Sequence, residues 1–194
     1  MGTNDESTSA LIGRAEQGEK IMFVHFWRHH PQQEGRVDAA CFSQWWPSPF
    51  TVDGIAYATA EHWMMAEKAR LFGDGEAERR ALEATSPAAA QKAGRLVSGF
   101  DEETWRTHRY GIVLAGSLHK FGRDPELRAY LLGTGDHVLV EASPVDRIWG
   151  IGLAEDAEAA HDPARWRGLN LLGFALMEAR ERLRADGGAE AGTA

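Results

Sequence analysis

The chain has 194 residues, of which 43% are hydrophobic and 26% are charged, a composition typical of a folded globular domain rather than a disordered segment. Its formal net charge of -8 argues against general electrostatic binding along a nucleic-acid backbone, although a local basic groove stays open. A single cysteine, Cys41, excludes an intramolecular disulfide framework and a cysteine-based structural zinc site.

The two ends of the sequence differ from the middle. Residues 1–18 are polar and residues 186–194 are mostly small, so both are predicted to be flexible tails. Neither a signal peptide nor an apolar stretch of membrane-spanning length is visible, and with a single cysteine we expect a cytoplasmic protein that has no membrane partner. Residues 19–185 contain no repeat and no linker, which predicts one domain.

Local signals in chain order predict an α+β fold, a predominantly helical single domain with a few short strands. Helix starts are indicated by capping residues and by proline at the first helical position, and one Asp-Gly pair predicts a hairpin turn. The predicted elements are a strand (21–27), a polar insertion-like loop (29–40), a hairpin (50–52 and 55–57) around Asp53–Gly54, a helix capped by Thr59 and ended by Gly73, a charged helix (75–84), a helix opened by Ser86–Pro87, a long helix from Asp101 through Phe121, a helix opened by Asp124–Pro125, a strand (137–142) and an amphipathic helix (169–184).

The helix after Thr59 carries the sharpest chemical signal. Glu61, Met65, Lys68 and Phe72 are spaced so that they share one helix face, and that face is otherwise apolar. One interpretation is a partly exposed Glu–Lys pair whose aliphatic stems cross the edge of the core. The other is the wall of a site, where burial shifts the pKa of both groups and prepares the lysine as a nucleophile and the glutamate as an acid or base.

Two further residues are candidates for the site. Asp146 lies just after the strand 137–142, where catalytic groups are common, but an aspartate there also caps turns. Trp105 lies in the first turn of the long helix beside Arg106 and Arg109 and is a candidate stacking surface, although a buried core role is the commoner one. Core positions are likewise the commoner expectation for the other tryptophans, while Trp45, Trp46 and Phe50 flank a proline-stiffened loop that suits an aromatic wall for a planar base.

Several familiar motifs are absent from the sequence. The Gly150–Gly152 stretch lacks the third glycine of a dinucleotide fingerprint, and no phosphate-binding P-loop or HExxH motif occurs. Cys41 has no basic or helix-start context that would indicate a nucleophile. We therefore expect no metal and no cofactor in the reaction.

Three ordered segments resemble one family. They are PSPFTVDGIAYATAEHWMMAEKARLF, TWRTHRYGIVLAGSLHKFGRDPELRAYLLGTGDHVLVEASPVDRIWGIGL and GLNLLGFALMEARERL, and on them the chain is similar to the NADAR (YbiA-like) family over roughly residues 21–183. The resemblance implies a helix-rich single domain with N-glycosidase activity. Position by position, it implies that Glu61, Lys68, Asp146 and Trp105 are the catalytic residues.

The chain departs from the family pattern at three places. Glu67 stands where the family commonly has glutamine, but neighbouring helix residues diverge by about 100°, so this carboxylate need not touch the site. Trp63 replaces a tyrosine, a change that is expected to alter the shape of the site. The loop 29–40 resembles an insertion near the site and is expected to bear on substrate choice.

The resemblance implies two substrate classes for an N-glycosidase: ADP-ribose linked to guanine in DNA, RNA or nucleotides, which is the preferred expectation, and ribosylamino-pyrimidine intermediates of riboflavin biosynthesis. A non-catalytic ADP-ribose or nucleotide reader is the alternative from another class. A small basic patch could hold a diphosphate, from Lys92, Arg95, Arg106, Arg109, Lys120 and Arg123, although each could equally lie on a solvated helix face. The residues expected to bind substrate are Phe50, Trp63, Met65, Arg109, Lys120, Phe121, Trp149 and Gly150.

Overall fold

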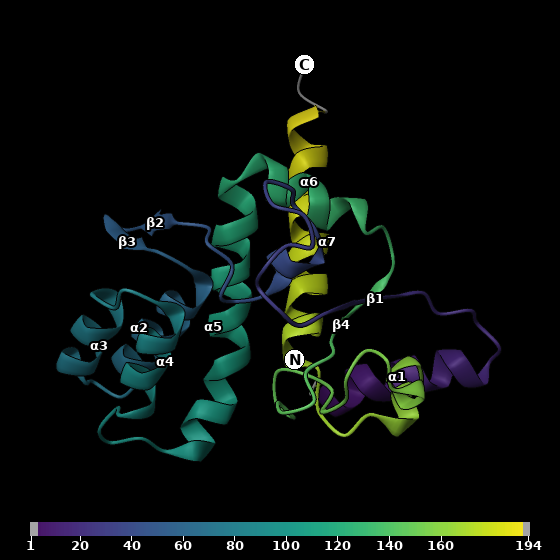
Figure 1. The fold of residues 1–194 in the computed structure, drawn as a ribbon, viewed down its shortest axis with the longest axis horizontal. Coiled ribbons are helices and arrows are strands. Elements are labelled where there is room, and N and C mark those ends of the chain that lie inside the picture. Colours follow the sequence, from purple (N-terminus) through teal and green to yellow (C-terminus); the bar gives the residue numbers. More distant parts are fainter. Residues whose placement is uncertain (1–3, 192–194) are drawn as a thin grey trace. The chain divides into compact units, whose positions relative to one another are not determined.

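The computed structural model describes residues 4–191 and confirms the predominantly helical α+β fold (Figure 1). The parts of the predicted tails at residues 1–3 and 192–194 lie outside the described residues. The α-helices are α1 (Asn4–Glu16), α2 (Ala60–Leu71), α3 (Gly75–Leu82), α4 (Pro87–Arg95), α5 (Glu102–Arg123), α6 (Pro125–Gly133) and α7 (Leu171–Ala191). The strands are β1 (Phe23–Phe26), β2 (Phe50–Val52), β3 (Ile55–Tyr57) and β4 (Val138–Glu141), and short 3-10 helices occupy Ala39–Phe42 (η1), Glu158–His161 (η2) and Pro163–Arg165 (η3).

The chain folds into two compact units. The central unit, Gln44–Ala129, is continuous in sequence and contains the β2–β3 hairpin and helices α2 to α5. The terminal unit combines the chain up to Ser43 with the chain from Tyr130 onward, and contains α1, β1, β4 and α7.

The hairpin of the central unit forms at the predicted residues. Strands β2 and β3 pair antiparallel, with Phe50 opposite Tyr57. Asp53 and Gly54 take φ values of 49° and 79°, the left-handed conformations that a two-residue hairpin turn requires. Helices α3 and α4 pack against α2 in the same unit (Figure 1).

The predicted helix starts are confirmed, but one of the predicted capping side chains does not bond to its helix. The Asp101 carboxylate accepts a hydrogen bond from the backbone N–H of Thr104 at 2.7 Å and caps α5, and the Ser86 hydroxyl caps α4. Thr59 occupies the N-cap position of α2, but its hydroxyl bonds His62 Nδ1 at 2.8 Å instead of a backbone N–H. The prediction of a threonine cap was wrong in this respect, because the buried imidazole competes for the hydroxyl.

Helix α2 is anchored on α5 through Trp63. The indole N–H of Trp63 donates to the carbonyl oxygen of Ile112 at 2.8 Å, and the indole ring lies against Gly116. A Cβ added at Gly116 would lie 2.6 Å from Trp63 Cδ1, so only glycine permits this approach. Because the ring packs between two turns of α5, this contact sets the position of α2 along α5.

We expect Gly116→Ala to lower the free energy of unfolding by about 1–3 kcal/mol, because the added methyl group displaces the Trp63 ring. Gly111, on the same helix, is a matched control because a Cβ there would meet no atom within 4 Å. Gly111→Ala is expected to raise stability by about 0.5–1 kcal/mol, since alanine is the better helix former. Urea unfolding of both variants checks the prediction, and equal effects would contradict it.

The terminal unit is built on a parallel pair of strands. β1 pairs with β4, with Phe23 opposite Val138, and α7 packs against β4. A Cβ at Gly173 would lie 2.1 Å from the carbonyl oxygen of Leu139, so glycine lets the first turn of α7 approach the strand backbone. The strand predicted over 137–142 is thus confirmed as β4.

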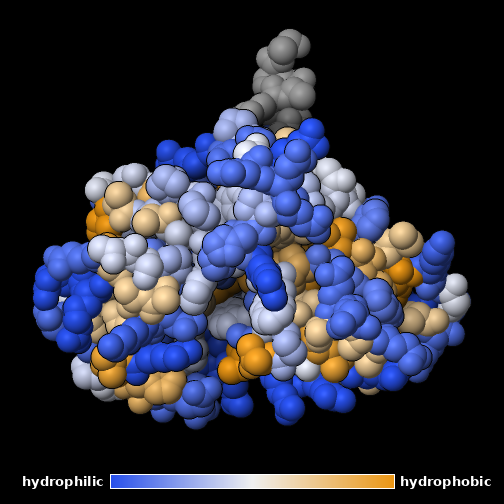
Figure 2. Space-filling model, viewed as in Figure 1, coloured by the Kyte–Doolittle hydropathy of each residue, from blue (hydrophilic) through white to orange (hydrophobic). Residues whose placement is uncertain are grey.

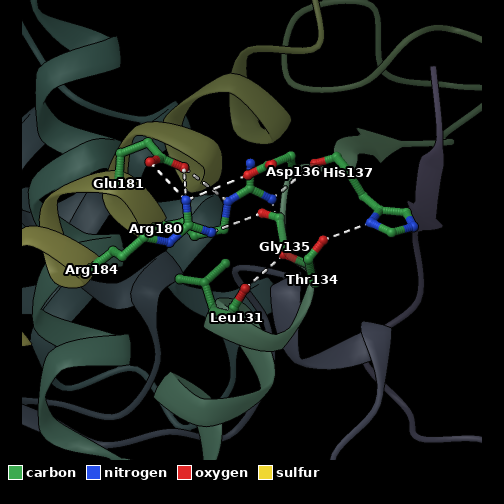
Figure 3. Close-up of polar contacts among 8 residues, drawn as sticks. All are labelled: Leu131, Thr134, Gly135, Asp136, His137, Arg180, Glu181 and Arg184. Atoms are coloured by element: carbon green, nitrogen blue, oxygen red, sulfur yellow. Dashed lines mark hydrogen bonds and ion pairs between the residues drawn. The ribbon is translucent and has the colours of Figure 1, made fainter. Parts of the chain in front are cut away.

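Helix α7 is fastened to the turn between α6 and β4 by two arginines (Figure 3). The buried guanidinium of Arg180 donates to the Thr134 hydroxyl and to the carbonyl oxygen of His137, each at 2.9 Å. One turn later, Arg184 donates to the carbonyl oxygen of Gly135 at 3.0 Å. These bonds satisfy backbone groups of the turn and hold it against the helix.

Helices occupy most of both segments that were expected to be tails. Residues 4–16 form α1, whose Leu11 is buried and which packs against η3. At the other end, α7 continues to Ala191, beyond its predicted end near residue 184. Leu11 and Ile12 are the only large apolar side chains in this polar segment, and two adjacent residues were too weak a signal to predict a packed helix from the sequence.

The surface in the view of Figure 2 intermixes hydrophilic residues with small groups of hydrophobic ones. Large exposed apolar side chains occur at separate places in both units: Met22, Trp27, Ile55, Leu96, Phe100, Val145 and Ile148. Across residues 4–191, no helix is both long and apolar enough to cross a membrane.

Candidate active site

The helix face predicted to carry Glu61, Met65, Lys68 and Phe72 is formed by α2 and its C-cap residue. Glu61 is 2% exposed and Met65 is buried, while Lys68 and Phe72 are half-buried. Glu61 and Lys68 lie seven residues apart, which places them about 10 Å apart along the helix axis on the same side. The carboxylate is thus buried and the lysine half-buried, and the role of this face as the wall of a site stays a prediction.

The ammonium group of Lys68 lies between two aromatic rings. Its Nζ is 4.3 Å from the centre of the Phe100 ring and 5.3 Å from that of Trp105, both within the range of cation–π attraction. Trp105 is in the first turn of α5 and Phe100 precedes the Asp101 cap, so the start of α5 positions both rings. Trp105 thus lies where the sequence predicted a site residue, whereas Phe100 was not predicted.

The surroundings of Lys68 shift the pKa of its amine downward. Burial lowers the pKa of Lys68 below its usual range, the nearby Glu102 raises it in part, and Arg95 lowers it further. A lysine with a lowered pKa is a stronger nucleophile near neutral pH, because more of it is unprotonated. The flanking rings also stabilise any positive charge that stays on its nitrogen after reaction.

Glu61 is held in the first turn of α2. Its backbone N–H donates to the carbonyl oxygen of Gln44 at 3.0 Å, so the segment after η1 is bonded to the start of the helix. The positive end of the helix dipole favours a carboxylate at this position. Gln44 was not predicted as a site residue, and the available signal in the sequence was a polar residue within the aromatic run CFSQWW.

Phe50 and Trp63, two of the aromatic residues predicted to bind substrate, lie in one packed cluster. Phe50 stacks on Tyr57 and on His119, with ring centres 5.6 and 5.9 Å apart, and Trp63 lies edge-on to both Tyr57 and His119. Burial lowers the pKa of His119. Phe50 and Trp63 therefore contribute to the core beside α2, and their direct contact with substrate stays a prediction.

Met65 also has a packing role. Its side chain fills the space that a Cβ at Gly94 would occupy, 2.0 Å from the sulfur, and so joins α2 to α4. Phe121, predicted to bind substrate, is fully buried on α5. Their direct contact with substrate likewise stays a prediction.

The six basic residues proposed for a diphosphate divide into two groups. Arg109 and Lys120 are buried, and Lys120 is only 1% exposed. These two residues therefore do not lie on a solvated helix face, which was the alternative interpretation of the six basic residues. The exposed members are Lys92, Arg95, Arg106 and Arg123.

Asp146, Trp149 and Gly150 belong to the terminal unit. The Asp146 carboxylate Oδ1 accepts the backbone N–H groups of Ile148 and Trp149, each at 2.8 Å, so this aspartate stabilises the turn as in the structural interpretation. Gly150 is tightly enclosed, since a Cβ there would lie 2.7 Å from the carbonyl oxygen of Glu141.

Asn170 supports the backbone beside this loop and was not predicted. It is fully buried at φ 51°, its side-chain oxygen accepts the N–H of Glu141 at 3.0 Å, and its side-chain nitrogen donates to Leu139 at 2.9 Å. Its position in the segment GLNLLG, between two tightly packed glycines, was the available signal.

Glu67, which stands where the family commonly has glutamine, pairs with Arg70 and not with Lys68. Glu67 pairs closely with Arg70, which also bonds Glu78 and the hydroxyl of Tyr57, so the carboxylate is directed along the other side of α2. Among residues 7–186, whose side chains the structure describes, no group of three or more histidine, cysteine, aspartate or glutamate side chains is arranged to hold a metal ion. Cys41 is buried.

Comparisons with known proteins identify relatives of this chain. A model of the NADAR domain family matches residues 25–184 as one domain. N-glycosidase R617 of Acanthamoeba polyphaga mimivirus is 38% identical over 157 residues, covering 78% of this chain and 92% of that protein. N-glycosidase YbiA of Escherichia coli (strain K12) is 29% identical over 170 residues, covering 88% and 96%.

The fold agrees as well. The NMR structure of the E. coli protein YbiA matches with a TM-score of 0.69 at 28% sequence identity, covering 87% of this chain and 89% of that one. Together with the extent of the family match, this confirms the resemblance on which the catalytic residues were assigned. The chain belongs to the NADAR domain family.

Proposed function

We propose that this protein is an N-glycosidase that removes ADP-ribose from guanine, with Lys68 as the nucleophile. The observation that carries the proposal is Lys68 itself, held half-buried between two aromatic rings on the helix face that also bears the buried Glu61. The N-glycosidase names of the similar proteins support the reaction class.

The proposed reaction has two balanced steps. The unprotonated Lys68 amine attacks the anomeric carbon, and the bond to the base breaks with its electron pair moving to the base nitrogen. Of the two amine protons, one ends on the leaving base and one on the ring oxygen of the opened sugar, leaving an imine. Water then hydrolyses the imine, releases the sugar aldehyde and restores the amine.

Glu61 is proposed to move protons and to stabilise charge in these steps. Cleavage builds positive charge on the ribose, which a nearby carboxylate stabilises. The same carboxylate can carry a proton to the leaving base or take one from water. Arg95, which lies close enough to lower the pKa of Lys68, supplies positive charge suited to the diphosphate of ADP-ribose.

The test is direct product analysis. The protein is incubated with an oligonucleotide ADP-ribosylated on guanine and, separately, with ribosylamino-pyrimidine intermediates, and released products are followed by mass spectrometry. Release of ADP-ribose from the oligonucleotide is expected. Turnover of the pyrimidines alone would assign the other substrate class, and binding of ADP-ribose without any turnover would assign a reader.

Asp146 is proposed as the second carboxylate of the reaction. Asp146→Asn keeps the side-chain oxygen that accepts two backbone N–H groups but removes the charge, so we expect near-normal stability and a loss of kcat/KM of about 10²-fold. Asp146→Ala removes both bonds and is expected to cost about 1–3 kcal/mol of stability as well. Full activity in the asparagine variant would limit Asp146 to supporting the turn.

A further inference from the structure

The side chain of Gln44 is buried without hydrogen-bond partners. It is 8% exposed, and neither its amide nitrogen Nε2 nor its amide oxygen Oε1 bonds any of the described residues. Folded proteins satisfy nearly all buried polar groups, because an unmade hydrogen bond costs stability. A ligand that forms hydrogen bonds with both amide atoms would explain why this buried glutamine has no partner within the protein.

Gln44 lies beside the proposed site. Its carbonyl oxygen accepts the backbone N–H of Glu61 at 3.0 Å, so the two residues are joined at the first turn of α2. The buried amide of Gln44 and the buried carboxylate of Glu61 therefore belong to two backbone segments that are hydrogen-bonded to each other. Trp45 and Trp46, the next two residues, are half-buried and carry aromatic rings in the same segment.

We propose that the Gln44 amide binds the base of the substrate, an inference that rests on the proposed function. Nε2 donates to a carbonyl oxygen of the base, and Oε1 accepts from the adjacent ring N–H. A neutral amide offers one donor and one acceptor side by side, which matches the lactam edge of guanine. A phosphate oxygen would use only the donor and leave Oε1 unsatisfied.

The inference predicts opposite effects on stability and activity. Gln44→Met has similar size without polar atoms, so we expect the melting temperature to stay unchanged or rise. We expect its kcat/KM on the ADP-ribosyl-guanine oligonucleotide to fall about 10- to 100-fold, as for loss of a paired hydrogen bond to a base. Gln44→Asn keeps the amide and is expected to retain more activity than the methionine variant.

Gln91→Met is the matched control, since Gln91 lies half-buried on α4 and its amide is not among the unsatisfied ones. It is expected to leave kcat/KM unchanged. If Gln44→Met keeps the wild-type kcat/KM, or if Gln91→Met loses as much, the inference is overturned.

A binding measurement separates this inference from the proposed function. Guanosine is titrated into the wild-type protein and into Gln44→Met, and the shift in melting temperature is compared. If the wild-type protein cleaves neither substrate but guanosine stabilises it and not Gln44→Met, the proposed function fails and the base site stands. Equal shifts in both proteins, or no shift in an inactive wild-type protein, would overturn the base site.

Discussion

Replacing Lys68 with alanine is expected to lower kcat more than about 10³-fold while the protein stays folded, because the reaction loses its nucleophile. Sodium borohydride added during turnover is expected to reduce the imine and leave the sugar covalently attached to Lys68, as mapped by peptide mass spectrometry. The attachment is the decisive readout, since a merely structural lysine would not acquire it.

Two variants serve as controls for Lys68. Lys68→Arg keeps a cation between Phe100 and Trp105 but cannot form the imine, so it is expected to fold normally and remain inactive. Lys20→Ala removes an exposed lysine that is not a candidate site residue, and this variant is expected to keep the wild-type activity. Near-normal turnover by Lys68→Ala would show that the imine route is wrong.

The pH dependence follows from the same environment. Only the unprotonated amine attacks, so kcat/KM is expected to rise with pH until Lys68 is deprotonated. Because burial lowers the pKa of Lys68, this rise is expected to end below the pH at which an ordinary lysine titrates. Phe100→Leu removes the nearer ring and its attraction for the cation, and so is expected to move the rise to still lower pH.

Replacing Glu61 with glutamine is expected to lower kcat by about 10²- to 10⁴-fold, the usual effect of removing an acid–base group. The amide has the same size but can neither exchange the proton nor stabilise the positive sugar. Rates from single-turnover experiments measure this loss directly, and circular dichroism checks that the fold is kept.

Glu67→Gln is the matched control for Glu61, because it changes a glutamate on the same helix that pairs with Arg70. It also restores the residue that is common in the family, so activity is expected to be retained. Unchanged rates in both Glu61→Gln and Asp146→Asn would reject the carboxylate chemistry.

Much of the fold was predictable from local sequence. The Asp53–Gly54 hairpin and the Ser86 and Asp101 caps depend on interactions within a few residues, and all were found as predicted. The strand at β4 was also found where it was predicted, although its partner β1 lies far away in the sequence. Thr59 was the exception, because its hydroxyl is used by a buried histidine rather than by the helix.

The sequence by itself determined which residues are candidates for the site. Helical spacing placed Glu61 and Lys68 on one face, and the family motifs singled out Trp105 and Asp146. Only the tertiary structure decided what surrounds them: Phe100 over the lysine, the unsatisfied Gln44 amide at the first turn of α2, and Gly116 beneath Trp63. These contacts join residues far apart in the chain, so no local sequence pattern encodes them. Tertiary packing buries Lys68, which lowers its pKa, and buries the Gln44 amide without a hydrogen-bond partner.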